Sequence, residues 1–466
     1  KTEMKFKRFL LRALVHVKPA AFKVSMSKLL TFGCDSSVPE RNIALAYLFY
    51  ILLGFGLLVL PWSHTAATCN WVDDLFTAVS AVSTTGLATV DIPGAYTAFG
   101  QCVILLLVQI GSIGYMTISS YLMLHLARRI PERNFKVIRT ALPTPDELSV
   151  KRLIDNVVHF TLIFELAGFI ALWIAFGGSG VKHPAWDALF ISISSFGTAG
   201  FSTFHDSLCS FRDNLPVNII VSVLSFAGAM GFIVITDIRN KCTNRRYRVT
   251  FTTRVILVMT TAMTVAGTAA LTAFPASGQS EGFAARMLEA FFQTMSAMTT
   301  VGYNTFDLST LAPASTLVLT IIMFVGASPS GTGGGVKCTT ISAVYAFVMS
   351  RLRGDSKVTL RGNSLPANRV DSALASILIY GVALLSGVVL LVVSEDSPMS
   401  SLLFEAASAL GTVGISLGVT PELSVFGKLV VALLMYIGRI GVLNLGIALS
   451  THALRGAKSK DADIAL

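Results

Sequence analysis

The chain carries little charge for its length. Asp, Glu, Lys and Arg make up 13% of its 466 residues, whereas 53% are hydrophobic, and the mean hydropathy is +0.69. So few polar residues are unable to cover the surface of a soluble protein of this size. The composition therefore excludes an ordinary soluble domain and predicts a multi-pass protein whose solvent is lipid.

The sequence also lacks the usual residues of metal sites, disulfide scaffolds and enzymes. Its six cysteines, at 34, 69, 102, 209, 242 and 338, show neither metal-binding spacing nor the density of a disulfide framework. No glycine-rich dinucleotide motif follows a strand, and no ATPase motif is present. The apolar segments offer only His159 and Glu165 near one end, without a convergent catalytic group. We therefore expect no enzyme activity and no cofactor in this chain.

What the sequence has instead is long apolar runs. A run of about 20 residues is long enough to cross the hydrocarbon core of a bilayer. The runs occur in pairs, at approximately 43–60, 99–126, 157–176, 217–238, 255–274, 316–348, 372–393 and 425–451. They predict an all-α polytopic protein with eight membrane helices.

A short phrase lies between the two members of every pair. Its copies are 76–91 (FTAVSAVSTTGLATVD), 190–205 (FISISSFGTAGFSTFH), 292–307 (FQTMSAMTTVGYNTFD) and 404–418 (FEAASALGTVGISLG). Alignment places four threonines in register and, two residues later, four glycines: Thr84, Thr198, Thr300 and Thr412, then Gly86, Gly200, Gly302 and Gly414.

One unit used four times predicts helix, re-entrant pore helix with loop, helix, repeated around a single pseudo-fourfold pore. The units are expected at 43–126, 157–238, 254–349 and 372–451. A basic segment, 1–42, precedes them and a tail, 452–466, follows.

The phrase has the chemistry of an ion filter. Non-helical backbone is tolerated at membrane depth only where protein buries it or where it lines a water-filled path. Rings of backbone carbonyls replace the water shell of a monovalent cation, and glycine keeps side chains out of the lumen. We expect the ion ligands among the backbone oxygens of Thr84, Thr85, Gly86, Leu87, Thr198, Ala199, Gly200, Phe201, Thr300, Val301, Gly302, Tyr303, Thr412, Val413, Gly414 and Ile415.

Acidic residues lie at or before the starts of the short helices. There a carboxylate complements the positive end of the helix dipole, so we expect caps rather than ion ligands. These residues are Asp73, Asp74, Asp187, Glu289 and Glu405.

The positive charges gather in a few segments. All but six of the 36 Lys and Arg fall within 1–42, 127–156, 239–254, 351–371 and 452–466. By the positive-inside rule these segments, and hence both termini, are expected in the cytoplasm, with the four phrases opening outward. Basic loops beside anionic lipid explain the net charge of +10, so no nucleic-acid partner is expected.

Several motifs resemble one family of transporters. The phrases TTGLA, TAGFS, TVGYN and TVGIS, the run GASPSGTGGGVKCTT and the motif IGRIGVL are similar to those of the potassium transporter superfamily that includes TrkH, KtrB and the plant HKT proteins. The similarity looks strongest to the Ktr type, KtrB. In that superfamily a central glycine in all four loops goes with potassium selectivity. Ala199 before the second glycine and Leu417 in place of a threonine depart from the pattern, so the four sides are not equivalent.

The resemblance implies potassium-selective uptake across the plasma membrane, with potassium bound at the filter only. It also implies a homodimer and a separate cytoplasmic ring of KtrA-like, RCK-type subunits, which would bind ATP, ADP or NAD. Energy would come from ion gradients or the membrane potential. A sodium-conducting or weakly selective transporter is the alternative, and a scaffold without transport a remote one. Whether sodium couples to transport or only activates it stays open.

A second motif interrupts the third unit. Residues 326–337 (GASPSGTGGGVK) are rich in glycine and include a proline, so a membrane helix is expected to break there. A Walker A phosphate loop needs glycine directly before its lysine, whereas Val336 precedes Lys337. The resemblance identifies this run as an intramembrane gating loop, with gate residues Gly326, Gly331, Thr332, Gly333, Gly334, Gly335, Lys337 and Arg439.

Arg439 lies within the last apolar run, where an unpaired cation is costly. By the resemblance, it approaches the gating loop and helps hold it shut through the loop carbonyls. The alternative is a structural pairing with a buried acid such as Glu165. Lys337 either belongs to the gate or extends to the cytoplasmic side.

Overall fold

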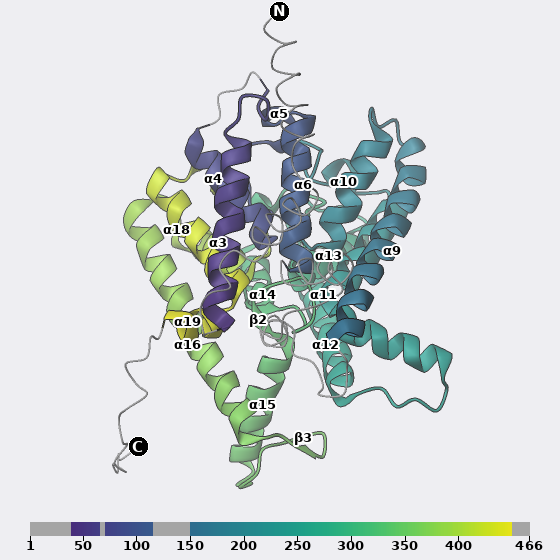
Figure 1. Ribbon diagram of the computed structural model, residues 1–466, viewed down its shortest axis with the longest axis vertical. Coiled ribbons are helices and arrows are strands. Elements are labelled where there is room, and N and C mark those ends of the chain that lie inside the picture. The colour runs from purple at the N-terminus through teal and green to yellow at the C-terminus, as the bar shows by residue number, and fades with distance from the viewer. Residues whose placement is uncertain (1–38, 66–69, 115–149, 450–466) are drawn as a thin grey trace, which may run out of the picture.

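The computed structural model describes residues 39–65, 70–114 and 150–449, which are mostly helical (Figure 1). The expected N-terminal segment up to residue 38, the end of the first unit beyond 114 and the tail from 450 lie outside the described residues. The long elements are α3 (Pro39–Leu58), α6 (Ala98–Ile113), α9 (Val150–Gly177), α11 (Leu215–Thr243), α12 (Phe251–Ala273), α14 (Pro313–Phe324), α15 (Cys338–Leu352), α16 (Ala367–Ser394) and α18 (Val425–Ile440).

Shorter elements lie between them. Two-residue strands pair as β1 (Val325–Gly326) with β2 (Val336–Lys337), in parallel, and as β3 (Thr359–Leu360) with β4 (Asn363–Ser364), antiparallel. The remaining helices are α4 (Trp71–Ser83), α5 (Ile92–Ala95), α10 (Pro184–Phe196), α13 (Phe283–Thr299), α17 (Met399–Gly411) and α19 (Val442–Leu449), with 3₁₀ turns at Cys209–Phe211, Leu308–Thr310 and Thr420–Glu422.

Four of the shorter helices, α4, α10, α13 and α17, form the buried centre of the molecule. Each packs between the helices that precede and follow it in its unit: α4 contacts α3 and α6, α10 contacts α9 and α11, α13 contacts α12 and α14, and α17 contacts α16 and α18. Their phrases are built from small and apolar residues, and most of their side chains are buried. We call these four the pore helices.

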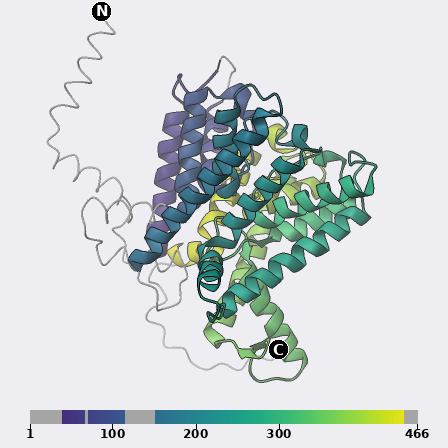
Figure 2. The ribbon, with the colours of Figure 1, turned by 90° about the vertical axis from the view of Figure 1, so that its right-hand side faces the viewer.

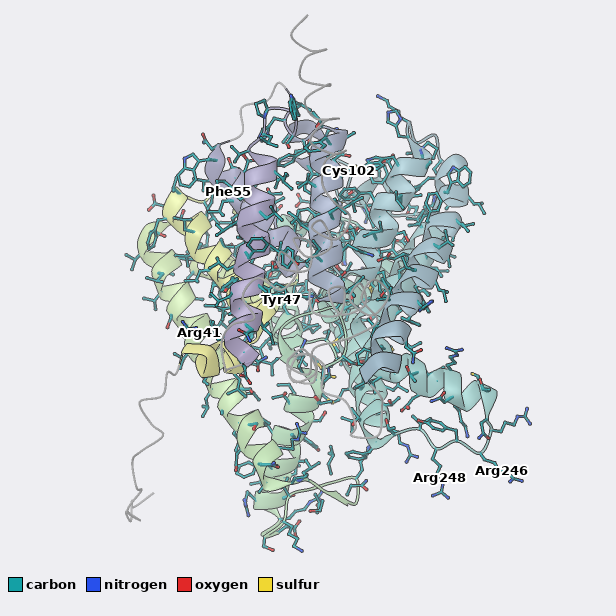
Figure 3. The ribbon with its side chains drawn as sticks, in the orientation of Figure 1. Arg41, Tyr47, Phe55, Cys102, Arg246 and Arg248 are labelled. Carbon is teal, nitrogen blue, oxygen red and sulfur yellow. The ribbon has the colours of Figure 1, made fainter. Side chains whose placement is uncertain are left out.

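Five described helices are long and apolar enough to cross a membrane, namely those at Glu40–Leu58, Asn156–Gly177, Leu215–Thr243, Phe251–Ala273 and Ala367–Ser394. The expected all-α class is therefore confirmed. Arg246 and Arg248 lie at the lower end of the molecule, between α11 and α12, and Cys102 lies near the upper end (Figure 3). Figure 2 shows α15 and the β3–β4 hairpin projecting beyond the lower ends of the other helices.

The second long helix is kinked or divided in the second and fourth units, which the sequence prediction of continuous helices missed, and in the first unit α6 ends where the described residues end. Helix α6 stops before Gly114, α11 is kinked at Gly231, and α18 stops before Gly441, after which α19 begins. These glycines have φ of 82°, 73° and 87°, a left-handed conformation that other residues rarely adopt. The expected single helix over 425–451 is therefore two helices.

In the third unit α14 ends at Phe324 and α15 begins at Cys338, so the chain leaves the helical path over the glycine-rich run. The short β1–β2 pair closes the base of this excursion, with Val325 opposite Val336 and Gly326 opposite Lys337. We call 325–337 the inner loop.

A second glycine, three residues before each kink, lets these helices touch the pore helices. A Cβ on Gly111, Gly228 or Gly438 would overlap a backbone carbonyl oxygen near the end of a pore helix, that of Val82, Phe196 and Leu410 respectively. No side chain fits between the two backbones, so the helices pack at the distance that only glycine permits.

Because the two backbones are so close, adding one methyl group at Gly228 is expected to lower the stability of the protein markedly. Gly228→Ala should push α11 away from α10 and destabilise the protein by about 1–3 kcal/mol, the usual cost of overpacking. Gly56→Ala is the matched control, since a Cβ there meets nothing within 4 Å. The apparent melting temperature in detergent should fall for Gly228→Ala and stay level or rise for Gly56→Ala. If Gly228→Ala and Gly56→Ala melted at the same temperature, the close packing of α11 against α10 would be contradicted.

Candidate functional site

The loops that follow the four pore helices meet in a closed ring. A Cβ on the glycine of one loop would overlap the carbonyl oxygen just before the glycine of the next. The pairs are Gly86 with Ala199, Gly200 with Val301, Gly302 with Val413, and Gly414 with Thr85. The last pair returns to the first loop, so the four loops, called loops 1 to 4 in chain order, surround one axis.

Backbone conformation makes the glycines doubly necessary. Their φ angles are 91°, 68°, 88° and 91°, all in the left-handed region. The threonine just after each pore helix is also left-handed, with φ of 54°, 50°, 60° and 50° at Thr84, Thr198, Thr300 and Thr412. This pair of conformations turns the chain sharply away from the helix and presents backbone, rather than side chains, to the axis.

A serine in every pore helix fastens the loop that follows. The serine carbonyl accepts the N–H of the residue before the glycine, at 2.8–3.1 Å, in the pairs Ser80 with Thr85, Ser194 with Ala199, Ser296 with Val301 and Ser408 with Val413. The sequence analysis gave these serines no role, although they occupy the same place in all four phrases.

The serine hydroxyls divide into two types. In loops 1 and 4 the hydroxyl accepts the glycine N–H: Gly86 donates to Ser80 Oγ at 3.0 Å, and Gly414 donates to Ser408 Oγ at 3.1 Å. In loops 2 and 3 it donates instead to the carbonyl that follows the glycine. Those bonds run from Ser194 Oγ to Phe201 O at 2.9 Å and from Ser296 Oγ to Tyr303 O at 2.6 Å.

The inner loop lies directly against the four threonines. Thr332 Oγ1 is 2.9 Å from Thr198 Oγ1. A Cβ on Gly333 would overlap Thr300 Oγ1, and one on Gly334 would overlap Thr412 Oγ1. The fourth threonine, Thr84, receives a hydrogen bond of 2.9 Å from Arg439 Nη1. The inner loop and Arg439 together therefore cover the end of the ring at the threonine level.

Beyond the inner loop, on the side away from the four threonines, lies a cavity of about 300 Å³. Glycines of the inner loop, Lys337 and Arg439 line it, together with Tyr380 of α16 and Asn444 of α19. The inner loop thus separates this cavity from the ring.

Backbone hydrogen bonds attach the inner loop to α11. Ser328 N–H donates to Ala229 O and Thr332 N–H donates to Gly228 O, both at 3.1 Å. A Cβ on Gly231 would overlap Ser330 O, so the kink in α11 also makes room for the inner loop. Lys337 Nζ donates to Gly333 O at 2.6 Å, within the loop itself, which is against the alternative of an extended, snorkelling lysine.

The guanidinium of Arg439 links three parts of the chain. Besides the Thr84 hydroxyl, it donates to the carbonyl oxygens of Thr332 in the inner loop and Gly111 in α6. The alternative pairing with Glu165 is wrong, because Glu165 Oε2 accepts from Gln109 Nε2 at 2.8 Å instead. Backbone carbonyl oxygens, one of them in the inner loop as the resemblance implied, accept the hydrogen bonds of Arg439 in place of an acid.

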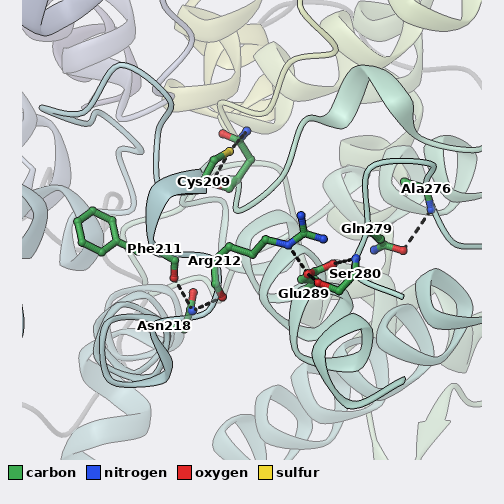
Figure 4. Close-up of polar contacts among 9 residues, drawn as sticks. Cys209, Phe211, Arg212, Asn218, Ala276, Gln279, Ser280 and Glu289 are labelled. Carbon is green, nitrogen blue, oxygen red and sulfur yellow. Dashed lines mark hydrogen bonds and ion pairs between the residues drawn. The ribbon is translucent and has the colours of Figure 1, made fainter. Parts of the chain in front are cut away.

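The acidic residues at the pore-helix starts join neighbouring elements rather than cap their own helices. Asp73 pairs with Lys428 of α18 at 2.8 Å, and Asp74 accepts from Tyr96 Oη at 2.9 Å. Glu289 accepts from Arg212 and, at 2.6 Å, from the Ser280 hydroxyl (Figure 4). The hydrogen bond to Glu289 raises the pKa of Arg212.

The Asp73–Lys428 pair joins the pore helix of the first unit to a long helix of the fourth. Similarly, Arg212 follows the second unit's pore loop and binds the pore helix of the third. These ion pairs lie at the upper ends of the helices and none involves the loop glycines. Each of them ties a pore helix to an element of another unit, and neither involves the contacts of the ring, which are made by the backbone.

A comparison with family models decides the family. The model of the TrkH family, described as cation transport protein, matches residues 40–454. The chain belongs to the TrkH family. With its apolar helices it is a multi-pass membrane protein, and its relatives are transporters rather than enzymes.

Curated relatives are similar over most of their length. The chain is 32% identical over 412 residues to the Ktr system potassium uptake protein B of Bacillus subtilis, covering 87% of this chain and 91% of that protein. Identity to the protein of the same name from Vibrio alginolyticus is 32% over 417 residues, with 88% and 91% covered. The potassium/sodium uptake protein NtpJ of Enterococcus hirae is 30% identical over 426 residues, with 90% and 94% covered.

A solved structure shares the fold. The potassium transporter TrkH from Vibrio parahaemolyticus superposes with a TM-score of 0.70 at 19% sequence identity, covering 96% of this chain and 95% of that one. The likeness extends over the whole membrane region and supports the fold of this TrkH-family chain.

The ion pair between Asp73 and Lys428 predicts a testable stability effect. Their side chains are only 9% and 15% exposed, so Lys428→Met leaves a nearly buried carboxylate without its partner. We expect a loss of up to about 3 kcal/mol, much of it recovered in the double variant Asp73→Asn with Lys428→Met. Thermal unfolding in detergent measures both. A double variant no more stable than Lys428→Met would mean that the pair does not join the two units.

Proposed function

We propose that this chain is the membrane subunit of a Ktr-type potassium uptake system and that potassium passes through the ring formed by loops 1 to 4. The closed ring of glycines and backbone carbonyls is the observation that carries the proposal. Potassium is the transported ion rather than a resident cofactor. The printed names of the curated relatives, two of which are Ktr system potassium uptake proteins, agree with it.

The oxygen atoms around the axis fit a weakly hydrated monovalent cation. The proposed ligands are found among the backbone carbonyls of residues 84–87, 198–201, 300–303 and 412–415. At the threonine level, Thr300 Oγ1 and Thr412 Oγ1 are buried without a hydrogen-bond partner among the described residues. Since a buried hydroxyl without a partner is costly, a cation at this level would supply the missing interaction.

The inner loop is proposed as the gate. It covers the ring at the threonine level, and its glycines give it the conformational freedom that a moving segment needs. Arg439 would hold the closed loop through Thr332, and its positive charge near the path would prevent the site from becoming a deep cation trap.

Orientation and partners complete the proposal. The basic lower end, with Arg246 and Arg248, would face the cytoplasm of the cell, and the loops would open outward across the plasma membrane (Figure 3). We propose a homodimer regulated by a cytoplasmic ring of KtrA-like, RCK-type subunits that bind ATP, ADP or NAD. The relatives' printed description as part of a Ktr system supports a protein of several components.

A second candidate is a transporter that also carries sodium. The relative NtpJ is named a potassium/sodium uptake protein, and Ala199 and Leu417 make the four loops unequal. Sodium as an activator or coupling ion belongs to the same candidate.

Potassium uptake by cells that lack their own uptake systems tests the filter. The unaltered chain should support rubidium or potassium uptake that excess sodium inhibits poorly. Gly86→Ser should reduce the preference for potassium over sodium at least about tenfold, equal to about 1.4 kcal/mol, since its side chain would displace the carbonyl of Ala199. Gly56→Ser, on an exposed face of α3, is the control. A Gly86→Ser protein with unchanged selectivity would contradict the filter assignment.

Proteoliposome leak tests the gate. Arg439→Gln loses the charged hydrogen bonds to Thr332 and Gly111, each worth about 1.5–3 kcal/mol, so the closed state should become less populated. We expect rubidium leak, without any regulatory subunit, to rise at least several-fold, and more strongly after deletion of 331–335. Arg254→Gln, at an exposed arginine of α12, is the control. Leak that stays at the unaltered level in both gate variants would refute this role.

A further inference from the structure

The carbonyl that follows each glycine forms the outermost level of the proposed filter. These carbonyls belong to Leu87, Phe201, Tyr303 and Ile415, one from each loop. A symmetric filter would use all four as ligands, as the sequence analysis expected. Their hydrogen bonds differ between loops in a way that bears on this expectation.

The Phe201 carbonyl already accepts two hydrogen bonds. Ser194 Oγ donates to it from the pore helix behind the loop, and Tyr303 Oη donates to it from loop 3, both at 2.9 Å. A carbonyl oxygen has two lone pairs. Both are therefore committed to protein donors, and Phe201 has none left for an ion.

The Tyr303 carbonyl is held in the same manner. Ser296 Oγ donates to it at 2.6 Å, and Gln293 Nε2 makes a longer contact of 3.5 Å. All three side-chain groups, from Ser296, Gln293 and Tyr303 itself, are buried. Water is thus not available to replace these donors if the carbonyl turns toward the axis.

Loops 1 and 4 leave the corresponding carbonyls open. There the serine hydroxyl accepts from the glycine N–H rather than donating to the next carbonyl. Within the described part of the chain, no donor is bonded to the carbonyl oxygen of Leu87 or Ile415. These two carbonyls are free to bind an ion.

The open and committed carbonyls lie on opposite halves of the ring. Gly414 of loop 4 adjoins Thr85 of loop 1, and Gly200 of loop 2 adjoins Val301 of loop 3. The two open carbonyls are therefore neighbours, and so are the two committed ones.

We propose that Ser194, Ser296 and the Tyr303 hydroxyl are positioning residues that withdraw two carbonyls from the outermost level of the filter, so that an ion there is held by Leu87 and Ile415 on one side and by water on the other. The inference rests on the proposed function, because it concerns the ligands of the same filter. A half-hydrated outer ion binds weakly, and complete dehydration, on which selection among cations depends, is left to the deeper rings.

The Phe201 carbonyl provides the test, because its two donors are removed separately by Tyr303→Phe and Ser194→Ala. Each variant frees one lone pair, and the double variant frees both. We expect the KM for rubidium uptake through the full chain to fall in steps, reaching about three- to tenfold in the double variant, as for a ligand worth one net hydrogen bond. The maximal rate per molecule in the membrane should stay near that of the unaltered protein.

Two controls separate this effect from simple structural damage. Ser408→Ala removes a serine in the same register that frees no carbonyl, so it should not lower KM. Tyr345→Phe removes the hydroxyl of an exposed tyrosine in α15 and should change neither parameter. A structural role alone would lower the maximal rate and the melting temperature and would leave KM unchanged or raise it.

The outcomes are distinct. If the unaltered chain takes up no rubidium, the proposed function fails. If it does so and the double variant, intact by melting temperature, keeps the original KM, only the inference about the outermost level is overturned. If the double variant unfolds, the single Tyr303→Phe variant decides, because it removes one oxygen and keeps the ring: an unchanged KM overturns the inference, and a lowered KM supports it.

Discussion

The whole arrangement depends on four stretches of backbone approaching one axis without side chains between them. Each loop glycine lies so close to the next loop's carbonyl oxygen that a single methyl group would overlap it. Because the contacts run around a closed ring, moving one loop displaces its neighbour. The four pore helices must therefore hold their loops at fixed depth, and the serine in each helix does so through the same backbone hydrogen bond.

Close backbone approach recurs away from the ring and has the same physical cause. Gly111, Gly228 and Gly438 bring long helices against the ends of pore helices, and the inner loop passes over the Gly231 kink. Replacing side-chain packing by backbone contact leaves carbonyl oxygens within reach of the path. Arg439 takes two of these, from Thr332 and Gly111, and so needs no acidic partner.

Much of the ring and of the inner loop could be predicted from the sequence, because positions that require glycine recur at the same place in each phrase. The four phrases predicted the threonine and glycine positions that the structure brings to one axis, and the glycine-rich run predicted the break between α14 and α15. The kinks at Gly231 and Gly441 were missed because an apolar run gives the same hydropathy whether one helix or two occupy it. By the resemblance Arg439 was expected at the carbonyls of the inner loop, where it donates to Thr332 O. Its bond to Gly111 O was missed, because a backbone carbonyl leaves no trace in residue identity.

The hydrogen bonds of the serine hydroxyls could not be predicted from the sequence, for a different reason. Ser80 and Ser194 are the same residue in the same register, yet one accepts a hydrogen bond and the other donates. The neighbouring loops differ as well: Tyr303 reaches across to Phe201, and no counterpart from loop 1 reaches Ile415 within the described residues. The phrase alone cannot encode such a contact, since it joins two copies of the phrase through a side chain that only one copy has.

The inner loop is attached in different ways to the same two halves of the ring. It belongs to the third unit and is bonded through its backbone to α11 of the second. Among the described residues of the fourth unit, one side chain, Arg439, donates hydrogen bonds to it, and that side chain also reaches the first unit. Backbone pairing on one half is costly to break without replacement partners, while a guanidinium can exchange carbonyls for water in the adjoining cavity. The half of the ring with the committed carbonyls is thus also the half to which backbone hydrogen bonds attach the inner loop, and the asymmetry of the four loops continues into the inner loop.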